Sequence, residues 1–195
     1  MRALPRAGVI EISGVRARAI TAAIQILVEE GQDGLNLRAI AQRAGVGLAS
    51  IYHYFASKDE LLLHLAMAGY DELRRRILAQ QGRPDEVSPM RAGAHAFYGF
   101  AAAEPALFTL MFDSRLLAGH ASLRAAEQSL LDLYAASVEA DEQFPAGQRR
   151  DAALALWTMG RGVAAMMASE PTGRLPAEVL ERFFAGARYV VRRTS

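Results

Sequence analysis

No cysteine occurs among the 195 residues, and this absence excludes several classes of protein. Without thiols the chain has no disulfide scaffold, no thiolate metal site and no cysteine nucleophile. The histidines show neither the i, i+4 pairing nor the nearby carboxylates typical of a zinc site; they are His53, His64, His95 and His120. No serine lies in a nucleophile elbow. We therefore expect no metal and no catalytic residues.

The sequence also lacks a pattern for export or for spanning a membrane. Its first eighteen residues contain no apolar core of signal-peptide length, and Arg161 and two glycines interrupt the apolar stretch 152–169. Hydrophobic residues make up 52% of the chain, which is enough to bury a core. We expect a soluble cytoplasmic protein with no membrane partner.

Net charge is nearly absent as well, but its distribution is uneven. The formal net charge is +1. Residues 1–58 carry seven basic and four acidic side chains, a net charge of +3, whereas the remainder carries −2. An asymmetry of this size is common on solvated surfaces, so it favours a nucleic-acid partner only modestly.

No alternating strand pattern bounded by tight turns is present, and helical periodicity predicts an all-α fold. Ser13 is positioned to cap a first helix that Gly31 closes. The apolar positions of that helix are Ile20, Ala23, Ile24 and Leu27. Asn36 caps a short second helix that ends at Gly45, and a third helix follows at 48–55.

Ser57 and Glu60 form a capping box, which predicts that a long helix begins there. The stretch 80–89 has a linker composition and is the best candidate for a boundary between two functional parts. Beyond it we expect helices near 88–103, 105–117, 120–141, 147–169 and 176–193. We divide the chain into an N-terminal domain at 1–60 and a C-terminal domain at 61–195.

The segment 37–62, LRAIAQRAGVGLASIYHYFASKDELL, has the features of a helix-turn-helix. Two helices pack at a steep angle when the contact residues are small and the turn admits a left-handed backbone, as Ala41, Ala44 and Gly45 allow. Ile51 and Phe55 would anchor the second helix in a small core. Its outer residues would then be free to enter a major groove.

This segment resembles the DNA-binding domain of the TetR (tetracycline repressor) family, densely over about residues 13–62. The matching residues are Ile40, Ala41, Ala44, Gly45, Val46, Tyr52, Phe55, Ser57, Lys58 and Leu61. More loosely, 100–112 and 156–167 resemble the regulatory domain of the WHG-type subgroup. The resemblance implies an N-terminal three-helix DNA-binding domain and a C-terminal helical bundle that binds an inducer and dimerises.

Carried over by position, the resemblance implies that Tyr52 and Lys58 contact DNA phosphates. Lys58 stands at a helix N-terminus, where backbone amides also favour an anion, and it is the only lysine in the chain. Arg38, near the start of the second helix, is a further candidate for a phosphate or groove contact.

The recognition helix supplies the remaining DNA candidates. Ser50 and His53 are placed to meet base edges, and Leu48 and Ala49 offer apolar contact to a thymine methyl. Gly47 stands where the family usually has serine or threonine, so a hydroxyl contact to phosphate is missing. Because bidentate base-reading side chains are scarce here, specificity is expected to depend partly on DNA shape.

Aromatic and methionine side chains in the second half are candidates for a ligand cavity, although ordinary core packing uses the same residue types. These candidates are His95, Phe97, Tyr98, Phe108, Met111, Phe112, Tyr134 and Trp157. The last two helices carry wide apolar faces with small residues, which in the family form a four-helix dimer interface; an internal bundle face is the alternative. The candidate interface residues are Leu156, Gly160, Val163, Ala164, Met167, Leu180, Phe183, Phe184 and Ala187.

The resulting hypothesis is a homodimeric, non-enzymatic transcription regulator without a cofactor. We expect a repressor that a small-molecule inducer releases from a palindromic duplex operator. An activator of the same architecture is one alternative, and a helical ligand-binding or enzymatic bundle that does not bind DNA is another. Two glycine-containing segments, 45–50 and 160–165, approach a dinucleotide-binding loop, but neither follows a strand, so we reject that interpretation.

Overall fold

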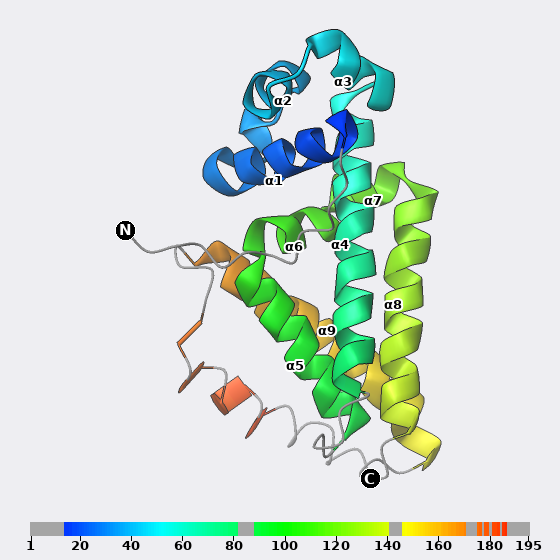
Figure 1. Ribbon diagram of the computed structural model, residues 1–195. Helices are drawn as coiled ribbons and strands as arrows, with labels where there is room; N and C mark the ends of the chain where they lie inside the picture. Colours follow the sequence, from blue (N-terminus) through cyan, green and yellow to red (C-terminus); the bar gives the residue numbers. More distant parts are fainter. Residues whose placement is uncertain are drawn as a thin grey trace. The chain divides into compact units, whose positions relative to one another are not determined.

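The computed structural model describes residues 14–81, 88–140 and 146–170 and parts of 175–186 (Figure 1). Within these ranges the regular elements are helices and there is no strand, so the all-α prediction is confirmed. The chain divides into two compact units between Leu61 and Leu62.

The first unit contains α1 (Val15–Gly34), α2 (Leu37–Ala44) and α3 (Leu48–Tyr54). The three helices pack around fully buried apolar side chains, which include Leu35, Ile40, Ile51 and Phe55. Val46, in the turn between α2 and α3, is half-buried. This small core fixes the angle between α2 and α3.

The buried face of α1 differs from the predicted one. Ala23 and Leu27 are buried as expected, but Ile20 and Ile24 are only half-buried. The buried set is Ala19, Ala22, Ala23, Ile26 and Leu27. Three of these five residues are alanines, and Ile20 and Ile24 flank the buried stripe.

The end of α1 is also later than predicted. Gly31 has φ 72° and ψ −170°, a backbone conformation that interrupts the helix, but helical turns resume and reach Gly34. Ser13, the predicted N-cap, lies outside the described residues.

Helix α4 (Lys58–Gln81) begins at the predicted capping box. Ser57 Oγ accepts the Glu60 amide at 3.1 Å, and the Glu60 carboxylate accepts the amide of Ala56 at 2.7 Å. The second bond is therefore made one residue before the cap.

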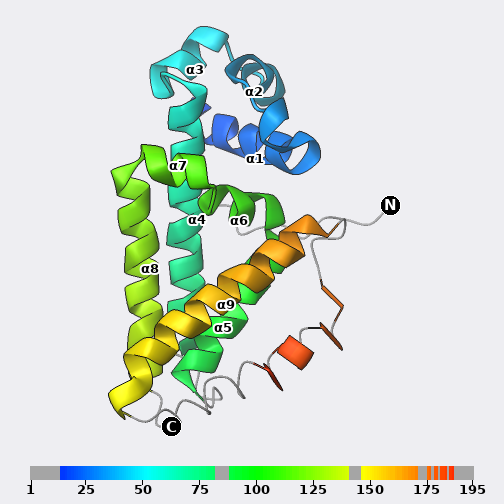
Figure 2. The ribbon, with the colours of Figure 1, turned by 180° about the vertical axis from the view of Figure 1, so that it is seen from behind.

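The second unit contains most of α4 together with α5 (Pro89–Ala103), α6 (Pro105–Met111), α7 (Ser114–Gly119), α8 (Ala121–Glu139) and α9 (Arg149–Ser169), the last preceded by a short 3₁₀ turn, Ala146–Gln148. Helix α8 runs alongside α4, and Arg74 donates to the Ser129 hydroxyl at 3.1 Å between them. Helix α9 crosses α5 obliquely (Figure 2). These helices enclose an aromatic core.

Two predictions about the elements of this unit need correction. The single helix expected at 105–117 is divided into α6 and α7, because the Asp113 carboxylate caps a new helix by accepting the amides of Arg115 and Leu116 at 3.0 and 2.8 Å. The predicted boundary at 80–89 separates α4 from α5 inside one unit. Of the helix expected at 176–193, residues 178, 179, 181–183, 185 and 186 are described and helical.

Candidate nucleic-acid interface

The turn between α2 and α3 has the geometry that the sequence predicts. The Asn36 side chain caps α2 by accepting the Ala39 amide at 2.8 Å. At the other end Gly45 has φ 64° and ψ 41°, the left-handed conformation that favours glycine. The Val46 amide then donates to the Ala41 carbonyl at 3.0 Å, which closes the turn.

Helix α3 exposes one side of its surface and buries the other. Ile51 and the following Phe55 are fully buried and anchor the helix. Tyr52 is 55% exposed, and His53 is exposed with its ring edge-on to that of Tyr54. Among the other predicted contacts, Gly47 and Ala49 are exposed, whereas Leu48 and Ser50 are half-buried. The exposed side of α3 is thus available to a partner.

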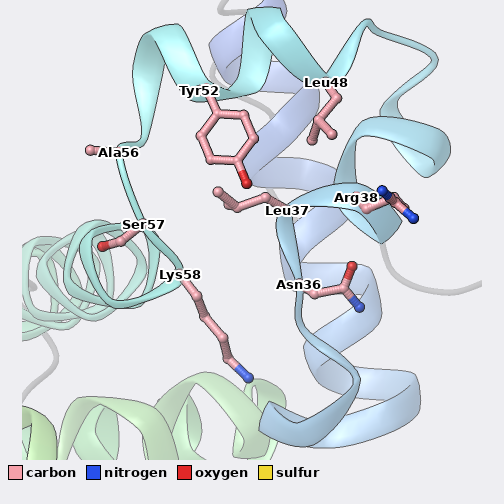
Figure 3. A pocket seen from close by; sticks show the side chains of 8 residues that line it. All are labelled: Asn36, Leu37, Arg38, Leu48, Tyr52, Ala56, Ser57 and Lys58. Atoms are coloured by element: carbon pink, nitrogen blue, oxygen red, sulfur yellow. The ribbon is translucent and has the colours of Figure 1, made fainter.

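A hollow of about 350 Å³ lies beside α3 within the first unit (Figure 3). The Tyr52 ring extends from α3 over Leu37, and its hydroxyl is directed into the hollow. The lining residues are Asn36, Leu37, Arg38, Leu48, Tyr52, Ala56, Ser57 and Lys58. Because α2 and α4 both begin here and two cations line it, the hollow favours an anion.

Arg38 and Lys58 are held differently. Arg38 is exposed, and its side chain makes no hydrogen bond or ion pair within the described part of the chain. The Lys58 ammonium is half-buried and donates to the Gln32 carbonyl at 2.7 Å. An ammonium has three donors, so this bond leaves capacity for an anion.

Arg43, unlike Arg38, is paired with acidic side chains of the first unit. Its guanidinium forms ion pairs with Glu29 at 2.5 Å and Glu30 at 3.3 Å, which join the end of α2 to α1. The charge of Arg43 is therefore neutralised locally, whereas that of Arg38 is not.

Sequence reasoning did not select two polar residues that line the hollow, Asn36 and Ser57. Both were recognised only as helix caps. Since a helix start is also a place where anions bind, two caps within one helix-turn-helix segment are a signal that could have identified them.

In the second unit, four of the predicted ligand-binding residues line a cavity of about 20 Å³: Phe97, Tyr98, Tyr134 and Trp157. Their rings pack closely, with centroids 5.7 Å apart for Phe97 and Trp157 and 6.1 Å for Tyr134 and Trp157. Burial raises the pKa of Tyr98 and Tyr134 far above the usual value, so both hydroxyls stay protonated. This cavity holds about one water molecule, far less than a drug-sized ligand occupies.

The other four predicted ligand-binding residues do not line this cavity. His95 is exposed, because it lies off the buried stripe of α5 that includes Ala92, Ala96 and Phe100. Phe108 and Met111 are buried in the core, and Phe112 is half-buried.

Most of the predicted dimer-interface residues on α9 face the interior of their own chain. Gly160, Val163, Ala164 and Met167 are buried and Leu156 is half-buried, so the stripe identified from the sequence is the core side of the helix. On the last segment Phe183 is half-buried near Tyr98, with ring centroids 6.4 Å apart, and Leu180, Phe184 and Ala187 lie outside the described residues.

The opposite face of α9 carries exposed apolar and small residues. Leu154 is 57% and Met166 is 53% exposed. The exposed positions of this outer face are Leu154, Ala155, Thr158, Gly162, Ala165 and Met166. Their spacing follows a helical period, so they form a continuous stripe.

Two protein-family sequence models match the chain. Residues 19–65 match bacterial regulatory proteins of the tetR family, and residues 90–187, half of the chain, match the tetracyclin repressor-like C-terminal domain. The chain belongs to the TetR family. The resemblance stated from residues 13–62 is thus confirmed, and the first match contains all eight predicted DNA contacts.

Relatives of this TetR-family chain are HTH-type transcriptional regulators. Rv1816 of Mycobacterium tuberculosis is 31% identical over 112 residues, which cover 55% of this chain and 47% of that protein. BetI of Burkholderia cenocepacia is 34% identical over 93 residues, 46% of either chain. FasR of Mycolicibacterium smegmatis, a transcriptional activator by name, is 29% identical over 100 residues, 51% of this chain and 46% of FasR. The chain spans about half the length of the relatives it matches.

Solved TetR structures share the fold over nearly the whole chain. PfmR from Thermus thermophilus gives a TM-score of 0.66 at 18% identity and covers 90% of this chain and 97% of its own. A tetR-family regulatory protein from Rhodococcus RHA1 also gives 0.66, at 20% identity, with 92% and 97% covered.

The expectation of a non-enzymatic transcriptional regulator agrees with the matched family and with the names of these relatives. Across the described residues, no three histidine, aspartate or glutamate side chains gather as metal ligands would. No helix in the same part of the chain has the length and apolar character needed to cross a membrane.

Proposed function

We propose that the protein is a cytoplasmic repressor that binds duplex DNA through α3 and is released from its operator by a small-molecule inducer. The observation that carries this proposal is the exposed side of α3 next to a hollow lined by Arg38 and Lys58. A helix that projects from a small core fits a major groove, and adjacent cations fit the flanking phosphates.

The contacts divide into two kinds in this proposal. Arg38, Lys58 and the Tyr52 hydroxyl bind phosphates and fix the position of the protein on DNA. The recognition helix, from Gly47 to His53, reads the groove. Because Lys58 also holds the Gln32 carbonyl, its replacement by alanine would lower both stability and DNA affinity.

The outer face of α9 supports a two-fold dimer. A second copy packed against Leu154, Thr158 and Met166 would cover exposed apolar surface, and small residues permit close helix approach. A two-fold dimer presents two recognition helices to successive major grooves and therefore selects a palindromic site.

Induction is a population shift in this proposal. The inducer binds more tightly to a conformer whose recognition helices are spaced wrongly for adjacent grooves, and α4 carries the change because it continues from one unit into the other. Near-complete switching requires a differential affinity of roughly 5.5 kcal/mol. Equal ligand affinity for the free and DNA-bound protein, measured by calorimetry, would contradict it.

Activation is the second candidate, because one of the relatives, FasR, is named an activator. A reporter gene placed behind the selected operator distinguishes the two, since deletion of the regulator raises expression under repression and lowers it under activation.

The proposal is tested by selecting bound fragments from random duplex DNA with the purified chain, followed by a salt titration of the enriched site. We expect a palindrome whose affinity falls steeply with salt. An Arg150→Ala variant is the matched control for Arg38→Ala, because residue 150 is a cation of the second unit. If folded protein enriches no sequence at low salt, the proposal is wrong.

A further inference from the structure

Arg161 of α9 is a charged side chain placed at the edge of the aromatic core. Its Nη1 donates to Glu127 Oε1 of α8 at 2.6 Å, and its guanidinium carbon lies 4.6 Å from the centroid of the Phe112 ring. The Arg161 side chain is 37% exposed and that of Glu127 21% exposed. The pair is therefore sheltered, yet it is reachable from solvent.

The Arg161 guanidinium is held in a fixed orientation, but most of its N–H donors make no hydrogen bond within the described residues. A guanidinium offers five N–H donors in a planar fork that fits both oxygens of a carboxylate. Within the described residues only Nη1 of Arg161 is hydrogen-bonded, and stacking on Phe112 holds the plane in place. Glu127 thus occupies one N–H donor of Arg161, and the remaining donors could bind both oxygens of a ligand carboxylate.

The aromatic cavity lies next to this site. Trp157, which lines the cavity, stands one helical turn before Arg161, and its ring centroid is 6.4 Å from that of Phe112. The cavity lining contains no charged side chain; the remaining lining residues include Ile77, Leu156 and Gly160. Such a lining suits the apolar body of a ligand, and the adjacent arginine suits an acidic end.

We propose that Arg161 binds the carboxylate of an apolar monocarboxylic acid. The apolar body of that ligand enters the aromatic cavity. Without ligand, the Glu127 carboxylate binds Arg161 in place of the ligand carboxylate. This inference rests on the proposed ligand-responsive function and names the chemical class of its ligand. Since the cavity holds about one water molecule, the rings around Trp157 must separate when the ligand enters.

A route from this site to α4 is present in the same contacts. The Tyr70 hydroxyl of α4 donates to the Met111 carbonyl of α6 at 2.9 Å, and the Tyr70 ring packs edge-on against Phe112. Burial raises the Tyr70 pKa, the Glu127 carboxylate raises it further, and the Arg161 guanidinium opposes both. Displacement of Phe112 by a ligand at Arg161 would therefore be transmitted to Tyr70 of α4.

The experiment uses the fluorescence of Trp157, the only tryptophan of the chain. The full-length protein is titrated at pH 7 with decanoate and with 4-phenylbutanoate, each compared with its primary amide. We expect the carboxylates to change the emission and the amides to bind at least about tenfold more weakly, because each amide lacks the charge-assisted hydrogen bonds.

Two variants that break the same ion pair distinguish a ligand site from a structural contact. Arg161→Gln should weaken carboxylate binding about tenfold or more, whereas Glu127→Gln should preserve or strengthen it, because the competing carboxylate is gone. Arg161→Lys retains the charge without the fork and should bind with intermediate affinity. If Arg161→Gln does not fold, the carboxylate affinity of Arg161→Lys tests the inference instead.

Three outcomes would overturn the inference: equal binding of acids and amides, equal losses in Arg161→Gln and Glu127→Gln, or no response to either carboxylate at 1 mM (on the order of the weakest useful affinity). The DNA selection above is run on the same proteins without ligand. Loss of enrichment in wild type as well as in variants would contradict the proposed function, whereas normal enrichment with no carboxylate response would contradict this inference alone.

Discussion

The two glycines of the helix-turn-helix differ in whether their backbone conformation tolerates a side chain. Gly45 has φ 64°, whereas Gly47 has φ −66° and ψ 141°, a conformation open to any residue. A Cβ at Gly45 would meet nothing within 4 Å, so the cost of a side chain there is conformational. A Cβ at Gly47 would lie 3.8 Å from the Ser50 hydroxyl, an ordinary contact.

We therefore predict that Gly45→Ala lowers the free energy of unfolding by about 1 kcal/mol and that Gly47→Ser raises it by a few tenths, roughly the gain from a hydroxyl cap. Chemical denaturation followed by circular dichroism measures both. Similar losses in the two variants would show that the turn is not governed by the backbone conformation described.

Glu104, between α5 and α6, provides a test that depends on pH. Burial raises the pKa of its carboxyl, Arg76 lowers it and Glu72 raises it. Arg76 is already engaged, since its Nε donates to the Glu72 carboxylate at 2.6 Å and its guanidinium lies over the Phe100 ring. Folding thus favours the neutral form of Glu104 relative to the unfolded state.

Because the folded pKa of Glu104 exceeds the unfolded one, its stabilising contribution is complete below the unfolded pKa, about 4.3 for glutamate, and is lost as pH rises through the folded pKa. Glu104→Gln should accordingly raise the Tm at pH 7, and the difference from wild type should shrink toward pH 4. Thermal unfolding at several pH values measures this, with the exposed Glu139→Gln as control. A lower Tm at pH 7 would mean that attraction to Arg76 dominates.

At the scale of single elements, the proposed division of labour on α2 and α3 predicts distinct DNA-binding defects. Arg38→Ala should weaken binding to all sequences and reduce the slope of log affinity against log salt by about 0.9, because one phosphate contact is lost. Tyr52→Phe should weaken binding without changing that slope, since the lost hydroxyl is neutral. Fluorescence anisotropy over a salt series measures both.

Ser50→Ala and His53→Ala serve as the comparison, because they should alter which sites are preferred. A change of sequence preference in Arg38→Ala, with no change of salt slope, would reverse the roles assigned here.

The elements also show what the sequence could predict. Local signals with one physical cause were reliable: the Asn36 cap, the left-handed Gly45 and the Ser57 cap appear as expected. Asp113 is a cap of the same kind, but it lies within a continuous apolar pattern and was not recognised as a cap. The single helix predicted at 105–117 is therefore two helices, α6 and α7.

Assigning a helix face to a partner was less reliable. On α9 both sides carry apolar and small residues, so periodicity alone did not distinguish the core side, with Val163 and Ala164, from the outer face, with Leu154 and Met166. Which side is buried depends on the packing of α5 and α8, and a linear pattern does not contain this information. The same limit applies to His95, whose aromatic neighbours are buried while it is exposed.

At the scale of the whole molecule, the proposed dimer predicts that charges on the outer face of α9 separate the subunits. Leu154→Asp and Met166→Asp should each shift the protein toward monomer, because a charge would be desolvated in an apolar interface. Sedimentation velocity measures the change. Leu78→Asp is the matched control, since Leu78 is a comparably exposed apolar residue, at 46%, on α4. Equal dissociation by all three, or none by the α9 variants, would place the interface elsewhere.

In the proposed dimer, the two faces of α9 would link the ligand site of one subunit to the other subunit. The inner face supplies Trp157 and Gly160 to the aromatic cavity, and the outer face is the proposed contact with the second copy. A helix moves as a rigid rod over such short distances, so a displacement that opens the cavity also displaces the opposite side. Ligand affinities of the two protomers are then thermodynamically coupled, and saturation curves of the dimer should be non-hyperbolic while those of a Leu154→Asp monomer are hyperbolic.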